Sequence, residues 1–153
     1  MSAGIVLLLH GPNLNLLGQR EPEVYGNATL ADHETRVASL LKSAGYECVT
    51  HQSNSEGDIV DRIHAARGNT VGMILNSGAF THYSWALHDA LRLYAAPIIE
   101  VHLSNPGSRE EFRHTSVVAP VAAGTVAGFG GLSYDIAVQA LTALLTSPRN
   151  PTA

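Results

Sequence analysis

The stretch IVLLLHGPN, residues 5–13, decides how this chain folds. Its five consecutive aliphatic residues suit a strand that is buried on both faces, and the His-Gly-Pro-Asn that follows is typical of a sharp turn. Strands buried on both faces belong to parallel sheets, because helices cover both sides of such sheets. The opening of the chain therefore predicts an α/β fold built on a parallel sheet.

Strands and helices alternate along the rest of the chain. We expect further strands over residues 47–52, 71–75, 98–102 and 125–127, and helices over residues 29–44, 55–67, 83–94 and 132–145. A short helical turn is expected over residues 108–113. Right-handed crossovers between such strands give a three-layer domain with helices on both faces of the sheet. Among five-strand orders we expect the flavodoxin-like order 2-1-3-4-5, which periodicity alone does not fix.

The chain has material for one domain. Its 153 residues are 45% hydrophobic, so we expect a single domain over residues 1–146 and a disordered tail over residues 147–153. Residues 14–27 contain Gly18, Pro22 and Gly26, which predicts a long irregular loop. Long loops in compact domains are usually functional.

Composition argues against several classes of partner and chemistry. The net charge of -4 comes without a long run of like charges, so neither nucleic acid nor an anionic membrane is expected as a partner. No apolar run approaches the roughly 20 residues of a membrane helix, and the N-terminus lacks signal-peptide features, so we expect a cytoplasmic protein. The single cysteine, Cys48, is expected to be a buried, inert thiol. Lys42, the only lysine, falls in the last turn of an expected helix, which leaves a Schiff-base mechanism without a nucleophile.

Polar residues gather where the strands at 5–9, 71–75 and 98–102 end. They are His10 and Asn13, then Asn76 and His82, then Glu100 and His102. Ligands of parallel α/β sheets bind beyond the carboxyl ends of the strands, at the point where the strand order reverses. Any one of these residues could simply form a turn, but together they indicate a pocket.

Glu100 and His102 stand two residues apart on an expected strand, so their side chains leave the same face. The carboxylate can orient the imidazole as part of an acid–base pair, and a purely structural hydrogen bond fits these two residues equally well. The eight histidines show no HExxH, HxH or CxxC spacing, so no metal site is expected.

Two other functions lack the residues that they need. A phospho-receiver domain of this topology requires carboxylates after its first and third strands, where this chain has His10 and Asn76. The glycines between residues 124 and 131 do not form a GxGxxG motif after a first strand and are not followed by a P-loop lysine. Tight turning into the last helix is the favoured explanation of these glycines.

Several motifs resemble the type II 3-dehydroquinases, a small flavodoxin-like family. They are GPNLNLLG at 11–18, REP at 20–22 with YG at 25–26, Asn76 with Thr81-His82, DAL at 89–91, EVHLSN at 100–105 and REEFR at 109–113. They span nearly the whole chain in the family's order. The resemblance implies a lyase of the shikimate pathway, which serves aromatic amino-acid biosynthesis. Its reaction is the anti elimination of water from 3-dehydroquinate to 3-dehydroshikimate, through an enolate and without a cofactor.

The same resemblance implies roles for five residues. Tyr25 would be the base, and because a phenol is protonated at neutral pH, the Arg20 cation beside it would favour the phenolate. Both lie on the long loop, which could close as a lid. Asn13 would stabilise the enolate oxygen through a bound water. His102 would protonate the departing hydroxyl, and Glu100 would orient that imidazole.

The resemblance also implies substrate-binding residues and an assembly. The substrate carboxylate would be met by Asn76 and by the backbone N–H groups of Leu103 and Ser104. Its ring hydroxyls would be recognised by His82, Arg113 and Asp89. Asp89 would reach in from a neighbouring subunit, since family members form trimers packed into dodecamers.

The chain departs from the usual family pattern at His10, His88 and Thr115, where asparagine, arginine and histidine are commoner. These differences concern the fine structure of the pocket and the subunit contact. A non-catalytic ligand-binding domain of the same topology is the alternative function, and the loop with Arg20 and Tyr25 argues against it.

Overall fold

Five parallel strands form one sheet in the computed structural model, which describes residues 2–147. The strands are β1 (Ile5–His10), β2 (Glu47–Gln52), β3 (Gly72–Asn76), β4 (Ile98–His102) and β5 (Gly124–Ala127). Their order is β2-β1-β3-β4-β5, which confirms the expected flavodoxin-like order. β1 pairs with β2 on one side and with β3 on the other, with Leu8 opposite Thr50 and Ile74. The strand order therefore reverses between β1 and β3.

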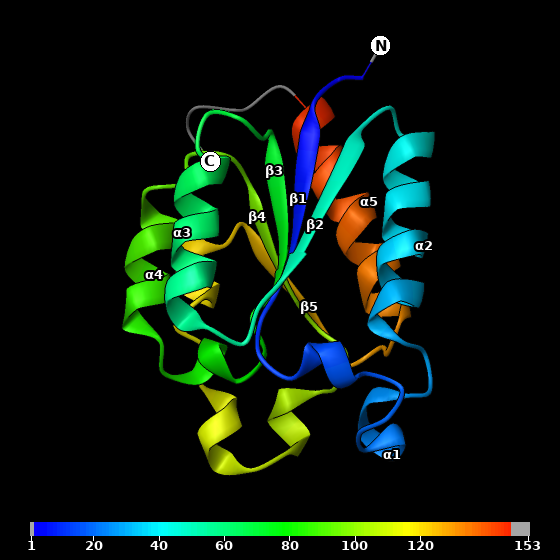
Figure 1. Ribbon diagram of the computed structural model, residues 1–153, viewed down its shortest axis with the longest axis vertical. Coiled ribbons are helices and arrows are strands. Elements are labelled where there is room, and N and C mark those ends of the chain that lie inside the picture. Colours follow the sequence, from blue (N-terminus) through cyan, green and yellow to red (C-terminus); the bar gives the residue numbers. More distant parts are fainter. Residues whose placement is uncertain (1, 148–153) are drawn as a thin grey trace.

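Helices cover both faces of the sheet (Figure 1). They are α1 (Pro22–Tyr25), α2 (Leu30–Ser43), α3 (Glu56–Ala66), α4 (Trp85–Arg92) and α5 (Leu132–Thr146). α2 and α5 lie on one face, and α3 and α4 lie on the other. None of the helices within residues 2–147 is long and apolar enough to cross a membrane.

The unbroken aliphatic run of β1 serves two cores at once. Val6 and Leu8 pack into the core under α2 and α5, whereas Leu7 and Leu9 pack into the core under α3 and α4. All four side chains are buried. Burial of each such side chain contributes about 1.5–3 kcal/mol, so this strand needs apolar residues at odd and even positions alike.

Three helices, α2, α3 and α5, begin where predicted, whereas α4 begins at Trp85, two residues after the predicted Tyr83, because the hydroxyl of Ser84 caps it. The hydroxyl of Thr29 accepts from the backbone N–H of Asp32 at 3.2 Å, and the Asp32 carboxylate accepts from the backbone N–H of Thr29 at 2.9 Å. This capping box satisfies two N–H groups that a helix end leaves unpaired. At the start of α3, the hydroxyl of Ser55 accepts from the backbone N–H of Asp58 at 3.3 Å, a single capping hydrogen bond.

Two other predicted segments differ from the structure. The loop over residues 14–27 contains a 3-10 turn (Leu14–Leu16) and the short helix α1, both too short to give a readable hydrophobic period. The single helical turn expected at 108–113 is instead two 3-10 turns, Pro106–Ser108 and Glu111–His114, with Arg109 between them. Of the predicted disordered tail, residues 148–153 lie outside the described residues.

The turn after β1 passes very close to the end of β3. The N–H of Gly11 donates to the carbonyl of Asn76 at 2.8 Å, and a Cβ atom on Gly11 would lie 2.3 Å from the carbonyl oxygen of Ser77. Only glycine fits there. The close approach brings the segment after β1 beside the segment after β3, at the reversal of strand order.

Candidate active site

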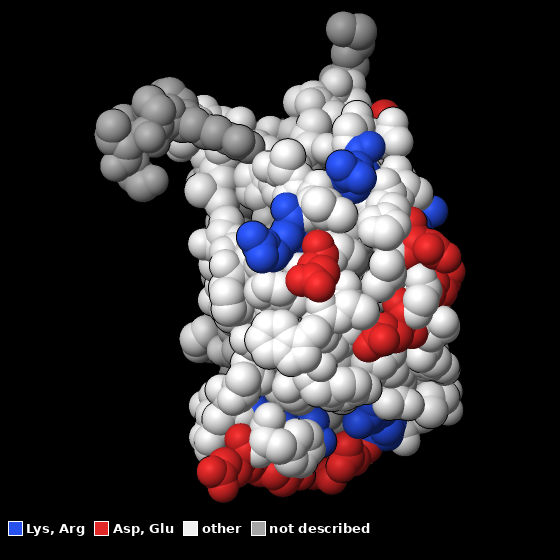
Figure 2. Space-filling view, turned by 90° about the vertical axis from the view of Figure 1, so that its left-hand side faces the viewer, with Lys and Arg blue, Asp and Glu red and all other residues white. Residues whose placement is uncertain are grey.

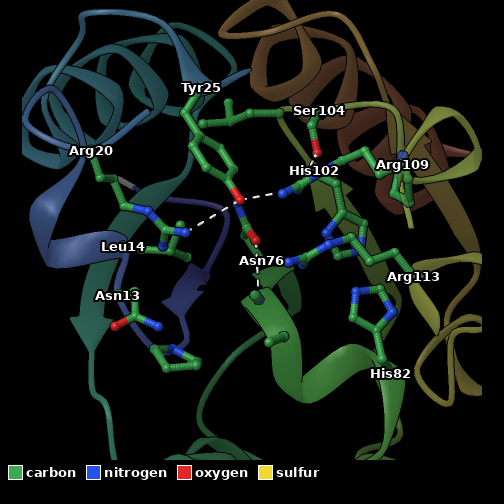
Figure 3. A pocket seen from close by; sticks show the side chains of 15 residues that line it. Asn13, Leu14, Arg20, Tyr25, Asn76, His82, His102, Ser104, Arg109 and Arg113 are labelled. Atoms are coloured by element: carbon green, nitrogen blue, oxygen red, sulfur yellow. Dashed lines mark hydrogen bonds between the residues drawn. The ribbon is translucent and has the colours of Figure 1, made fainter. Parts of the chain in front are cut away.

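A cavity lies at the carboxyl ends of β1, β3 and β4 (Figure 3). The predicted site residues on its wall are Asn13, Arg20, Tyr25, Asn76, His82, His102, Leu103, Ser104 and Arg113. α1 and the segment after β4 project beyond this end of the sheet (Figure 1). The structure thus brings together residues that lie up to 100 positions apart in the chain.

The hydroxyl of Tyr25 lies between two guanidinium groups. Arg109 Nη1 donates to this oxygen at 3.0 Å and Arg20 Nη2 donates at 3.4 Å, as the dashed lines of Figure 3 show. The two guanidinium carbons lie 4.6 Å (Arg20) and 5.3 Å (Arg109) from the centre of the phenol ring. Cationic donors on a phenol oxygen stabilise negative charge there.

Arg109 was given no role by the sequence, although it opens the quoted REEFR motif. Its side chain also donates to Ser104 Oγ at 3.1 Å, and it contacts Tyr25 across 84 residues of chain. A contact of that sequence separation has no local signal. The basic residues around one cavity, Arg20, Arg109 and Arg113, favour an anionic ligand.

The carboxylate of Glu100 is buried behind His102 and does not line the cavity itself. Glu100 Oε1 lies 2.8 Å from His102 Nε2, so the two side chains share a face as expected. The hydroxyl of Ser116 lies 2.8 Å from each carboxylate oxygen, and the hydroxyl of Thr81 lies 3.5 Å from Oε1. These contacts fix the imidazole and leave His102 Nδ1 as the ring nitrogen available to a ligand.

His82 and Asp89 occupy contrasting positions. His82 Nδ1 donates to the carbonyl of Thr115 at 2.8 Å, and burial lowers the pKa of His82, which favours the neutral imidazole with Nε2 unprotonated. Asp89 is exposed on α4, on the face opposite the buried Leu87 and Leu91, and it is not on the wall of this cavity. Within one chain, Asp89 is separate from the site.

Two other expectations concern cysteine and metal. Cys48 is half-buried, and burial raises the pKa of its thiol to about 11, which fits the predicted inert thiol. Among residues 2–147, no group of three His, Cys, Asp or Glu side chains is placed to hold a metal ion.

Basic and acidic side chains lie intermixed on the face of the molecule that Figure 2 shows.

A buried polar group also lies directly behind the cavity. His10 is fully buried, and its Nε2 lies 2.8 Å from the hydroxyl of Tyr134. Burial, reinforced by the neighbouring His33, lowers the pKa of His10 to about 3. His10 is therefore a neutral imidazole in the folded protein.

We expect this histidine to make the folded state sensitive to acid. Unfolding returns its pKa from about 3 to the ordinary 6.5, so the unfolded chain binds the extra proton between these values. The neutral His10 has no destabilising effect above pH 6.5, and below it the free energy of unfolding falls by about 1.4 kcal/mol per pH unit as the pH drops toward 3. The free energy of unfolding, measured with urea, should therefore be lower at pH 4.5 than at pH 7.0, and His10 should account for about 3 kcal/mol of the difference.

His10→Gln should remove that part of the decrease. His33, whose pKa burial also lowers, adds to the acid sensitivity, whereas Glu34, whose pKa burial raises, opposes it. Both groups remain in the variant, so the difference between the two proteins isolates His10. An equal loss of stability in wild type and His10→Gln would contradict the assignment.

Comparison with known proteins gives one consistent result. The family model described as "Dehydroquinase class II" matches residues 4–142. The 3-dehydroquinate dehydratase of Halalkalibacterium halodurans is 52% identical over 136 residues, which are 89% of this chain and 94% of that protein. That of Synechococcus sp. CC9902 is 53% identical over 136 residues, 89% of this chain and 93% of the relative.

Solved structures agree. The crystal structure of type II dehydroquinase from Propionibacterium acnes aligns with a TM-score of 0.89 at 39% identity, covering 93% of this chain and 98% of the other. A 3-dehydroquinate dehydratase-like protein from Bifidobacterium longum aligns with a TM-score of 0.71 at 30% identity, covering 94% and 99%.

Proposed function

The chain belongs to the class II dehydroquinase family, and from this premise we propose that it eliminates water from 3-dehydroquinate in the anti sense, with Tyr25 as base and His102 as acid. The product is 3-dehydroshikimate, so the enzyme acts in the shikimate pathway. The observation that carries the mechanism is the Tyr25 hydroxyl, held on the cavity wall by two guanidinium groups.

Tyr25 takes the proton from the carbon next to the substrate ketone. Arg20 and Arg109 stabilise the phenolate that this step requires, because each donates a hydrogen bond with a full positive charge behind it. The electrons of the broken C–H bond move to the ketone oxygen and form the enolate. Asn13, on the same wall, stabilises that oxygen through a bound water.

His102 completes the reaction. As the enolate reforms the ketone, the C–O bond to the hydroxyl breaks, and His102 Nδ1 supplies the proton that lets the hydroxyl leave as water. The carboxylate of Glu100 stabilises the imidazolium and keeps its ring oriented. The overall change is redox neutral, because one C–H and one C–O bond break, a C=C bond forms and water leaves, so the proposed reaction needs no redox cofactor.

The wall around these groups suits the rest of the substrate. Its carboxylate is met by the amide of Asn76 and the backbone N–H groups of Leu103 and Ser104, in a cavity rich in arginine. His82 and Arg113 recognise ring hydroxyls. Arg113 is held in place by the Glu110 carboxylate, three residues before it.

We also propose that the chain assembles as a homo-oligomer, a dodecamer of trimers, in which Asp89 completes the neighbour's cavity. The exposed position of Asp89 on α4 supports this arrangement, because its carboxylate is free to reach another chain. Two large aromatic side chains, Trp85 at the start of the same helix and Tyr83 two residues before it, are 64% and 59% exposed. Exposed aromatic residues of this size often mark protein interfaces.

Complementation between two inactive variants tests the role of Asp89. Tyr25→Phe and Asp89→Ala proteins should each be nearly inactive alone. After they are unfolded and refolded together in equal amounts, about a quarter of the sites should hold both native groups if mixing is random. Activity of the mixture should rise accordingly. If verified subunit exchange gave no increase, Asp89 would act within its own chain.

Absorbance of the enone product on addition of 3-dehydroquinate tests the proposed function as a whole. Product formation by the wild type is expected. A non-catalytic ligand-binding domain would instead bind the substrate, measured by calorimetry, without forming product. Cytoplasmic localisation stays a prediction.

A further inference from the structure

A chain of hydrogen bonds leads from the cavity wall into the protein core. The side-chain oxygen of Asn76 accepts from the backbone N–H of Gly78 at 3.2 Å, and its nitrogen donates to the Tyr134 hydroxyl at 3.2 Å. That hydroxyl lies 2.8 Å from His10 Nε2. Asn76, Tyr134 and His10 are 3%, 1% and 0% exposed, so water does not substitute for these contacts.

Only one arrangement pairs every donor with an acceptor between Gly78 and His10 Nε2. Because the Gly78 N–H can only donate, the Asn76 oxygen faces Gly78 and its NH₂ group faces Tyr134. The Tyr134 oxygen therefore accepts from Asn76, which leaves its own hydrogen for His10 Nε2. His10 must then carry its proton on Nδ1.

Two features around His10 and Tyr134 favour that arrangement. The carboxylate of Glu34 lies 3.7 Å from His10 Nδ1, and a negative charge there favours a proton on that nitrogen. Tyr134 lies in the first turn of α5, and its ring packs against the ring of His33, with the ring centres 5.1 Å apart. The hydroxyl therefore has little freedom to leave its position.

The fixed amide has a consequence for the ligand. One N–H of Asn76 is used by Tyr134, which leaves its second N–H for the cavity that the residue lines. A carboxylate only accepts hydrogen bonds, so it needs a donor at this place. A flipped amide would instead offer an oxygen, and it would also lose the contacts to Gly78 and Tyr134.

We propose that His10 and Tyr134 are positioning residues that hold the Asn76 amide with an N–H toward the cavity and thereby select a carboxylate-bearing substrate. This inference rests on the proposed function. The residues act through Asn76 and do not touch the reacting atoms. Their loss should therefore weaken binding of the substrate and spare the chemical step.

Tyr134→Phe is the main test, since it removes one oxygen and keeps the ring. We expect KM for 3-dehydroquinate to rise about 10- to 100-fold, the usual effect of losing a hydrogen bond to a charged group, with kcat within about threefold of wild type. The matched control is Tyr94→Phe. Tyr94 is also buried, and its hydroxyl lies 2.7 Å from Thr70 Oγ1, away from the cavity. Its KM should not change.

A double-mutant cycle distinguishes positioning from a general structural effect. In an Asn76→Ala background, Tyr134→Phe should change KM less than about twofold, because the group that it positions is gone. An undiminished increase in KM in that background would overturn the proposal. So would an unchanged KM in Tyr134→Phe itself.

Substitutions of His10 provide a second route if Tyr134→Phe folds poorly. His10→Gln retains an acceptor near the position of Nε2 and should keep KM close to wild type, whereas His10→Leu should raise it as Tyr134→Phe does. Circular dichroism checks folding of each variant. Equal KM values for His10→Gln and His10→Leu would contradict the inference. A wild type without turnover would instead refute the proposed function, so the two failures are distinguishable.

Discussion

Tyr25→Phe is expected to lower kcat by about 10²- to 10⁴-fold with little change in ligand affinity, because general bases contribute rate factors of this size. The substitution removes the proton acceptor and leaves the ring between its two arginine neighbours. Arg20 and Arg109 still line the cavity, so an anionic ligand keeps its electrostatic attraction. Steady-state rates and calorimetric binding of the product would measure the two effects separately.

Tyr46→Phe is the matched control for this experiment. Tyr46 is buried before β2, packs in the core under α2 and α5, and is not on the cavity wall. Its kcat should equal that of wild type. If Tyr25→Phe retained more than a tenth of wild-type kcat, Tyr25 would not be the base.

His102→Gln should lower kcat by a similar factor of about 10² to 10⁴, but it should leave the first half of the reaction intact. In heavy water, the variant should still exchange the proton on the carbon next to the ketone for deuterium, because Tyr25 and its arginine neighbours remain. Tyr25→Phe should lose both exchange and elimination. Nuclear magnetic resonance of the recovered substrate, compared with an enzyme-free sample, measures the exchange.

The pair of variants therefore assigns the base and the acid independently. Loss of exchange in His102→Gln would mean that the imidazole also acts in enolate formation. Faster exchange than elimination in this variant is the expected result. Folding should be retained, because glutamine keeps a donor for the buried carboxylate of Glu100.

Local chemistry explains why the framework could be predicted from the sequence. β1 is an apolar run because both of its faces are buried, and α2 begins directly after Thr29 because a capping box satisfies its first N–H groups. These causes act over a few residues, so the sequence displays them directly. The strand ends also indicated where polar side chains would meet, and the structure places Asn76 and His102 on one cavity there.

Contacts between distant segments had no such local cause. Arg109 reaches Tyr25 from a turn after β4, and Ser116 reaches Glu100 from a segment without regular secondary structure. Tyr134 was counted only as part of a helix, although its hydroxyl lies between Asn76 and His10. Their partners are set by how the chain crosses over the sheet, which residue spacing does not encode.

The short helix α1 carries the proposed base but contributes no buried side chain to the fold. Substitutions within it should therefore cost little folding free energy, whereas equivalent changes in β1 would remove core packing. Natural selection could vary the residues around Tyr25 and alter reaction rate while the sheet keeps the protein folded. Evolvability of this enzyme is thus concentrated in a segment that its stability hardly depends on.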